Sequence, residues 1–183
     1  MALYDELYEL YTFWFSNEQL WFNCSSDEDN LITTKYEKLL LNYSSRIPDF
    51  DNQKLMISII ILYDQISRHI CRIKKYDIID DLNKRIVEYI KHNYAKFDNV
   101  NVYEYCFVML PLRHTKDFNN IKFVLSESWN KLIKLNTESD KQQMKRFLKA
   151  TYENIIKQIT EVEFVDYQVS ELLNITSLIE NRT

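Results

Sequence analysis

The stretch NQKLMISIIILYDQISRHICR, residues 52–72, changes character along its length. From Leu55 to Leu62 it is hydrophobic on almost every side, and a helix that is hydrophobic all round is typical of a protein core. We therefore expect a central helix that begins near Asn52. Its second half, residues 61–72, brings a carboxylate, an amide, two arginines and a histidine within a few helical turns. That half is either the polar edge of a core helix or a ligand-binding site.

The composition favours an all-α fold in a single domain, residues 1–183. The chain of 183 residues contains no glycine and only two prolines. The lack of glycine excludes the Gly-rich loops that bind phosphates and dinucleotides, and it makes tight β-hairpins harder to form. With a net charge of −4, the chain does not have the basic character of most nucleic-acid-binding proteins.

Hydrophobic residues at helical spacing predict seven or eight helices with short connections, which favours antiparallel pairs. Ser25 and Glu28 have the spacing of a capping box. Pro111 is expected to end a short aromatic helix. The predicted helices cover residues 2–16, 29–43, 52 onward, 78–95, 102–110, 116–135, 139–159 and 166–180.

The cysteines and the hydrophobic segments favour a soluble protein of the cytoplasm. Cys24, Cys71 and Cys106 are odd in number and far apart, which suits a reducing compartment better than a disulfide framework or a zinc site. The longest aliphatic stretch, residues 55–63, is too short to cross a bilayer, and no signal peptide is evident. We expect no cofactor, no bound metal and no membrane association.

Three segments, in order, resemble a known family. They are FWFS at residues 13–16 with WF at 21–22, LYDQISRHICR at 62–72, and MLPLRHTKDF at 109–118. Together they resemble the mainly bacterial family named domain of unknown function 924 (DUF924). The resemblance runs from about residue 7 to 158. It implies a compact all-helical fold with tetratricopeptide-like helix pairs and no agreed activity.

The resemblance also implies candidate site residues. The positions of the family's motifs correspond in this chain to Asp64, Gln65, Arg68, Arg72, His114 and Asp117. The chain departs from the family pattern where Ser67 replaces a proline, His69 replaces an asparagine, and Thr115-Lys116 replaces Ser-Glu. The basic motif that ends the family pattern has no counterpart in the divergent segment 159–183.

Two interpretations of the charged half of the central helix remain open. Asp64, Arg68 and Arg72 share a helix face by their spacing, and two guanidinium groups together could bind a phosphate or a carboxylate. Alternatively, the residues form a buried structural network in which Asp64 accepts hydrogen bonds from Arg68 and from the segment around His114.

The segment after Pro111 supplies the other candidates. His114 is expected in a turn, where its imidazole could transfer a proton, and Asp64 is the second catalytic candidate. Thr115 is expected as a helix N-cap and Asp117 in the first turn, which would explain both without a ligand.

Two further groups of residues are expected to be structural. Large aromatic side chains are usually core or groove-wall residues, and Lys side chains that repeat every four residues usually form the solvated face of a helix. These groups are Trp14, Phe15, Trp21 and Phe22, and Lys141, Lys145, Lys149 and Arg146.

We expect a helical binding or interaction module whose Asp/Arg/His cleft takes an anionic ligand or a partner segment. One alternative is a hydrolase or transferase that acts on a phosphorylated or other anionic small molecule. Another is a structural subunit of a larger assembly. A protein partner is open, and nucleic acid is disfavoured by the charge without being excluded.

Overall fold

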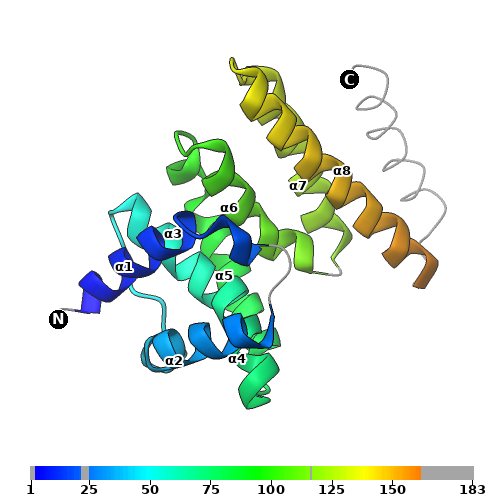
Figure 1. The fold of residues 1–183 in the computed structure, drawn as a ribbon. Helices are drawn as coiled ribbons and strands as arrows, with labels where there is room; N and C mark the ends of the chain where they lie inside the picture. Colours follow the sequence, from blue (N-terminus) through cyan, green and yellow to red (C-terminus); the bar gives the residue numbers. More distant parts are fainter. Residues whose placement is uncertain (1–2, 22–24, 116, 162–183) are drawn as a thin grey trace. The chain divides into compact units, whose positions relative to one another are not determined.

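The computed structural model describes residues 3–21, 25–115 and 117–161. These residues form eight α-helices and three short helical segments without a strand (Figure 1). The all-α fold class is therefore confirmed. The chain divides into two compact units, Met1–Val100 and Asn101–Thr183, and the prediction of one domain over residues 1–183 stays a prediction.

The first unit packs its helices in two pairs. In these pairs α1 (Leu3–Phe15) lies against α3 (Gln53–Ile61), and α2 (Ser26–Tyr43) lies against α4 (Ser67–Lys74). The unit also contains α5 (Ile79–Asn93) and two 3-10 helices, η1 (Glu18–Trp21) and η3 (Tyr94–Phe97). Side chains from each pair are fully buried, among them Leu10 and Trp14 of α1 and Leu40 of α2.

The segment 52–72 forms the central helix that its sequence predicts. Asn52 caps its start, because its side chain accepts hydrogen bonds from the backbone N–H groups of Lys54 and Leu55. Every residue of α3 from Leu55 to Ile61 is buried. The helix then widens into a π-helical turn, η2 (Leu62–Ile66), and continues directly as α4, so α3, η2 and α4 form one continuous helical path.

The second unit contains α6 (Val102–His114), α7 (Phe118–Lys134) and α8 (Glu138–Glu161), each of which packs against the other two. Asn101 and Glu104 form a capping box at the start of α6. The end predicted for this helix at residue 110 is wrong, since α6 continues through Pro111 to His114. Proline in a helix interior removes a backbone hydrogen bond, but Met109 and Leu112 on either side of it are completely buried, and this packing keeps the last turn helical.

The other predicted helices are found with ends that differ by a few residues, and Ser25 and Glu28 form the expected capping box. The predicted helix 166–180 lies outside the described residues.

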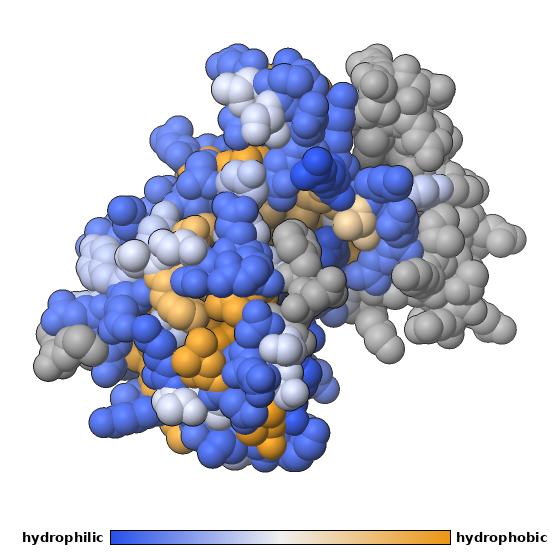
Figure 2. All heavy atoms as spheres, viewed as in Figure 1, coloured by the Kyte–Doolittle hydropathy of each residue, from blue (hydrophilic) through white to orange (hydrophobic). Residues whose placement is uncertain are grey.

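Large hydrophobic side chains are also exposed. Figure 2 shows, on the face that it presents, hydrophobic side chains in the region of α1 and α2 among hydrophilic ones. Among the residues whose burial is described, the exposed large hydrophobic ones are Tyr4, Tyr8, Leu31, Leu41 and Ile133. Of the helices that the structure describes, none has both the length and the hydrophobicity to cross a bilayer. The cytoplasmic location stays a prediction.

The central position of α3 generates a stability prediction. Ile60 has 0% exposure and Leu31 has 55%. Ile60→Ala should lower the free energy of unfolding by about 2–5 kcal/mol, because it leaves a cavity in the core. Leu31→Ala should change it by less than about 0.5 kcal/mol. Urea denaturation followed by circular dichroism measures both, and equal effects of the two substitutions would contradict the central role of α3.

Candidate functional site

Asp64 lies in the π-helical turn η2 and is buried beneath Arg68. Its exposure is 1%, and its Oδ1 accepts hydrogen bonds from Nη2 of Arg68 at 3.1 Å and, more weakly, from Nε at 3.4 Å. Its Oδ2 accepts a hydrogen bond from Nε2 of Gln65 at 2.5 Å. The side chain of Arg68 is 32% exposed. The predicted pair between residues 64 and 68 is therefore present, with the carboxylate inside and the guanidinium at the surface.

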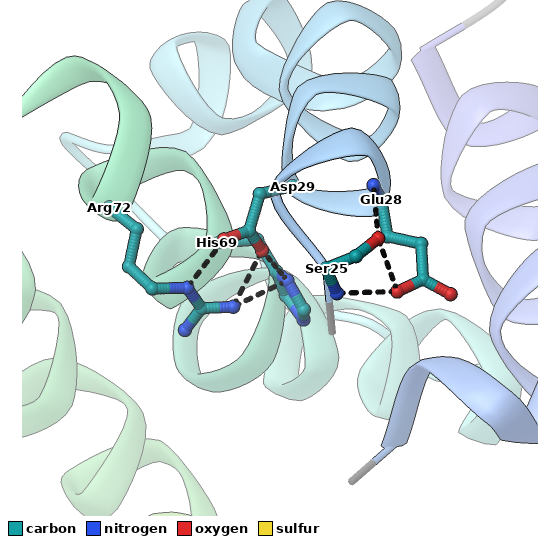
Figure 3. Close-up of polar contacts among 5 residues, drawn as sticks. All are labelled: Ser25, Glu28, Asp29, His69 and Arg72. Atoms are coloured by element: carbon teal, nitrogen blue, oxygen red, sulfur yellow. Dashed lines mark hydrogen bonds and ion pairs between the residues drawn. The ribbon is translucent and has the colours of Figure 1, made fainter. Parts of the chain in front are cut away.

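Arg72 reaches a different carboxylate, which the sequence had not linked to it. Its Nε donates to Oδ2 of Asp29 at 2.8 Å and its Nη2 donates to Oδ1 at 2.7 Å. This two-point contact joins α4 to the start of α2 (Figure 3). The side chain of Asp29 is 8% exposed and that of Arg72 is 50% exposed. Each arginine of α4 is thus held by its own buried carboxylate.

His69 completes the contact between α4 and α2. Its Nδ1 lies 2.6 Å from Oδ1 of Asp29, and its ring meets the ring of Trp14 edge-on with centroids 6.1 Å apart. Because the ionised carboxylate of Asp29 can only accept, we assign a proton to Nδ1. The 2.7 Å between this Nδ1 and Nη2 of Arg72 is then a close approach of two donors that share the oxygen of Asp29. Residue 69 is 5% exposed, and burial lowers the pKa of its imidazole even though the hydrogen bond to Asp29 acts in the opposite direction.

Asp29 is positioned by the start of α2. It lies in the first turn of this helix, beside the capping box of Ser25 and Glu28 (Figure 3). A carboxylate is favoured at a helix N-terminus by the helix dipole. The hydrogen bonds from Arg72 are the main cause that lowers the pKa of Asp29, and those from His69 act in the same direction against the effect of burial. Asp29 is therefore an ionised carboxylate that connects two helices.

The remaining two candidates lie in the second unit. His114 is the last residue of α6 rather than part of a turn, and it is half-buried. Asp117 is the N-cap of α7, where its side chain accepts a hydrogen bond from the backbone N–H of Asn120 at 3.1 Å. The expected N-cap at Thr115 is wrong, because Thr115 instead closes α6 by donating to the carbonyl of Leu112.

The six candidate residues therefore divide between the two units. The first unit contains Asp64, Gln65, Arg68 and Arg72, which lie on the continuous helical segment of η2 and α4. The second unit contains His114 and Asp117. The expectation that both groups share one cleft stays a prediction, as do their roles in ligand binding.

Sequence reasoning missed Asp29 and His69. One signal for Asp29 was available, because it lies three residues before Ile32 on the hydrophobic face of α2, where an acidic side chain needs a partner. His69 lies three residues before Arg72 and therefore shares a face of α4 with it. No feature of the sequence paired this face with the start of α2.

The aromatic residues near the N-terminus and the basic residues of α8 are expected to be structural, and their burial agrees with that role where the structure describes it. Trp14 is fully buried, and Phe15 and Trp21 are half-buried with their rings in edge-to-face contact. Of the expected basic stripe on α8, Lys141 and Lys145 are half-buried and Arg146 and Lys149 are exposed, and Phe22 lies outside the described residues. Within residues 3–21, 25–115 and 117–161, no three His, Cys, Asp or Glu side chains are grouped as metal ligands.

The buried Asp29–His69 pair predicts a loss of stability in acid. The unfolded chain protonates its histidines near the ordinary pKa of 6.5, whereas native His69 does so only at lower pH. The free energy of unfolding should therefore fall as the pH decreases through 6.5. A second fall should occur below the ordinary Asp pKa of 3.8, since the native pKa of Asp29 is lower than that.

Urea denaturation at pH 7.5, 6.5 and 5.5 measures the first of these effects. His69→Asn keeps a donor for Asp29 and removes the titrating group, so it should weaken the dependence on pH. His92→Asn replaces an exposed histidine and should preserve it. If the free energy of unfolding of His69→Asn depends on pH as strongly as that of the wild type, the titration of His69 is not the cause of the acid sensitivity.

The burial of Asp29 also predicts how much Arg72 contributes to stability. Arg72→Gln should lower the free energy of unfolding by about 1–3 kcal/mol, because it leaves a buried carboxylate with weaker partners. Arg85, which pairs with exposed Asp81 at 2.8 Å and donates to the backbone carbonyl of Ser45, is the matched control. Because both contacts are exposed, Arg85→Gln should cost less than about 1 kcal/mol. Thermal and urea unfolding of both variants test this, and similar losses would show that the contact with Asp29 adds little.

Comparison with known proteins supports the family and names no activity. The family model described as "Bacterial protein of unknown function (DUF924)" matches residues 10–161. No curated protein and no solved structure matches the chain. The matched range contains all six candidate residues as well as Asp29 and His69, and it agrees with the range of the resemblance in the sequence. The chain belongs to the DUF924 family.

Proposed function

We propose that the protein is a binding module and that its anion-binding surface is the face of α4 that carries Arg68 and Arg72. The ligand would present a phosphate or carboxylate group, on a small molecule or on an acidic partner segment. One observation carries the proposal: two partly exposed guanidinium groups lie one helical turn apart, and each is held from within by a buried carboxylate.

The buried carboxylates orient the guanidinium groups before a ligand arrives. Asp64 and Asp29 contact the Nε and Nη2 groups of Arg68 and Arg72. A fixed guanidinium loses less conformational freedom on binding, and its planar array of donors fits phosphate and carboxylate oxygens. Because each pair is close to neutral, selectivity would come from this geometry more than from a strong positive field.

The π-helical turn η2 gives further support. Turns of this kind are rare and occur frequently at functional sites. Here the turn contains Asp64 and Gln65 and leads directly into the helix that carries both arginines. The widened turn therefore determines where the first carboxylate lies relative to Arg68.

The geometry of this face favours binding over catalysis. A hydrolase or transferase would need a proton-transfer group beside the bound anion. The histidine that contacts Arg72 is His69, which is buried and hydrogen-bonded to Asp29 through Nδ1. We therefore do not assign it the role of an acid or base toward a ligand. The same proposal includes tetratricopeptide-like pairing of the helices. It also includes a protein partner, whose acidic segment would bind to the two arginines.

A thermal-shift screen tests the proposal. Its panel contains inorganic phosphate, pyrophosphate, phosphorylated metabolites and an oligo-glutamate peptide, which separates the small-molecule source of the anion from the peptide source. At least one ligand should raise the melting temperature of the wild type. In Arg68→Gln its affinity should fall about 10- to 100-fold, the value of one or two charge-assisted hydrogen bonds.

Arg85→Gln serves as the matched control, because Arg85 also pairs with a carboxylate four residues away, and it should bind as the wild type does. The proposal fails if no ligand of the panel loses its stabilising effect in Arg68→Gln, or if Arg85→Gln loses it equally.

A further inference from the structure

One carboxylate oxygen is shared by two potential cations. Oδ1 of Asp29 lies 2.6 Å from Nδ1 of His69 and 2.7 Å from Nη2 of Arg72. The same Nη2 lies 2.7 Å from Nδ1, so the three atoms form a tight triangle (Figure 3). Any charge gained by the imidazole would therefore arise next to the guanidinium group.

The surroundings of His69 determine its charge at neutral pH. Helix α2 contributes Asp29 and Glu28, which favour the protonated imidazole, and α4 contributes Arg72, which opposes it. From α1 the ring of Trp14 packs against the imidazole. Burial is the largest influence and lowers the pKa, so His69 is neutral at pH 7.5. At that pH the Asp29–His69–Arg72 cluster has a net charge of zero.

We propose that protonation of His69 switches the α4 surface to a state that binds anions more tightly. This inference rests on the proposed function, and it assigns a pH-dependent control to the same surface. When the imidazole becomes an imidazolium, the net charge of the cluster rises from zero to +1. The added proton goes to Nε2, since Nδ1 already carries one. The imidazolium then repels the adjacent guanidinium and donates a stronger, charged hydrogen bond to Oδ1 of Asp29, the oxygen that Nη2 of Arg72 also contacts.

Both effects favour an anion at Arg72. The added positive charge attracts the ligand, and the weakened contact with Asp29 makes it easier for Arg72 to turn toward the ligand. Half of the Arg72 side chain is exposed, so a ligand can reach it from solvent, whereas the side chain of His69 is 7% exposed. By thermodynamic linkage, a bound anion must in turn raise the pKa of His69.

Sulfate is a suitable probe, because it remains a dianion between pH 5.5 and 7.5. Its dissociation constant is measured by isothermal titration calorimetry with the full chain at constant ionic strength and at both pH values. The wild type should bind sulfate about fivefold or more tightly at the lower pH, the size of a typical coupling between two sites. His69→Asn should remove most of this difference, whereas His92→Asn should retain it.

A second readout does not depend on the strength of binding. The ring signal of His69, identified by its loss in His69→Asn, should titrate at a higher pH when sulfate is present. Circular dichroism of each variant confirms that it is folded at both pH values.

The outcomes separate this inference from the function on which it rests. Sulfate binding that Arg68→Gln weakens, but whose dependence on pH is the same in wild type and His69→Asn, would overturn the inference and leave the proposed function in place. Sulfate binding that is unaffected by Arg68→Gln, or no binding at either pH, would overturn both for this ligand class.

Discussion

The buried carboxylate of Asp29 is the interaction on which the arrangement of the first unit depends. An ionised group inside a protein is tolerated only when charged or polar partners compensate for the lost water. Here Arg72 and His69 provide that compensation from α4, and the N-terminus of α2 adds its dipole. Since these partners are 40 and 43 residues away in sequence, the contact fixes how two helices of the core pair, and it also fixes the direction of the Arg72 side chain.

The two departures from the family pattern at this helix are compatible with the same geometry. An asparagine at position 69 would carry its Nδ2 donor as many bonds from the backbone as Nδ1 of His69, so either residue can donate to Asp29. At position 67, Ser67 supplies a backbone N–H to the carbonyl of Leu62 and a hydroxyl to that of Tyr63, which a proline could not do. The difference at position 69 matters for function, because asparagine does not titrate and histidine does.

Local features of the sequence predicted the helices, and the contacts between distant helices could not be predicted in the same way. The cap at Asn52, the capping box at Ser25 and the hydrophobic residues from Leu55 onward are short-range signals, and the structure confirms them. The end predicted at Pro111 was wrong because tertiary packing of α6 outweighs a local rule. For the site, spacing predicted the pair of Asp64 and Arg68. The partner of Arg72 depends on the register of α2 against α4, which no local pattern encodes.

The central claim is that Asp29 and Arg72 stabilise each other directly, and a double-mutant cycle measures this. The free energies of unfolding at pH 7.5 of the wild type, Asp29→Asn, Arg72→Gln and the double variant give the coupling energy of the pair. We expect a favourable coupling of about 1–3 kcal/mol, the upper part of the range for residues in direct contact. Additive effects, with a coupling near zero, would contradict it.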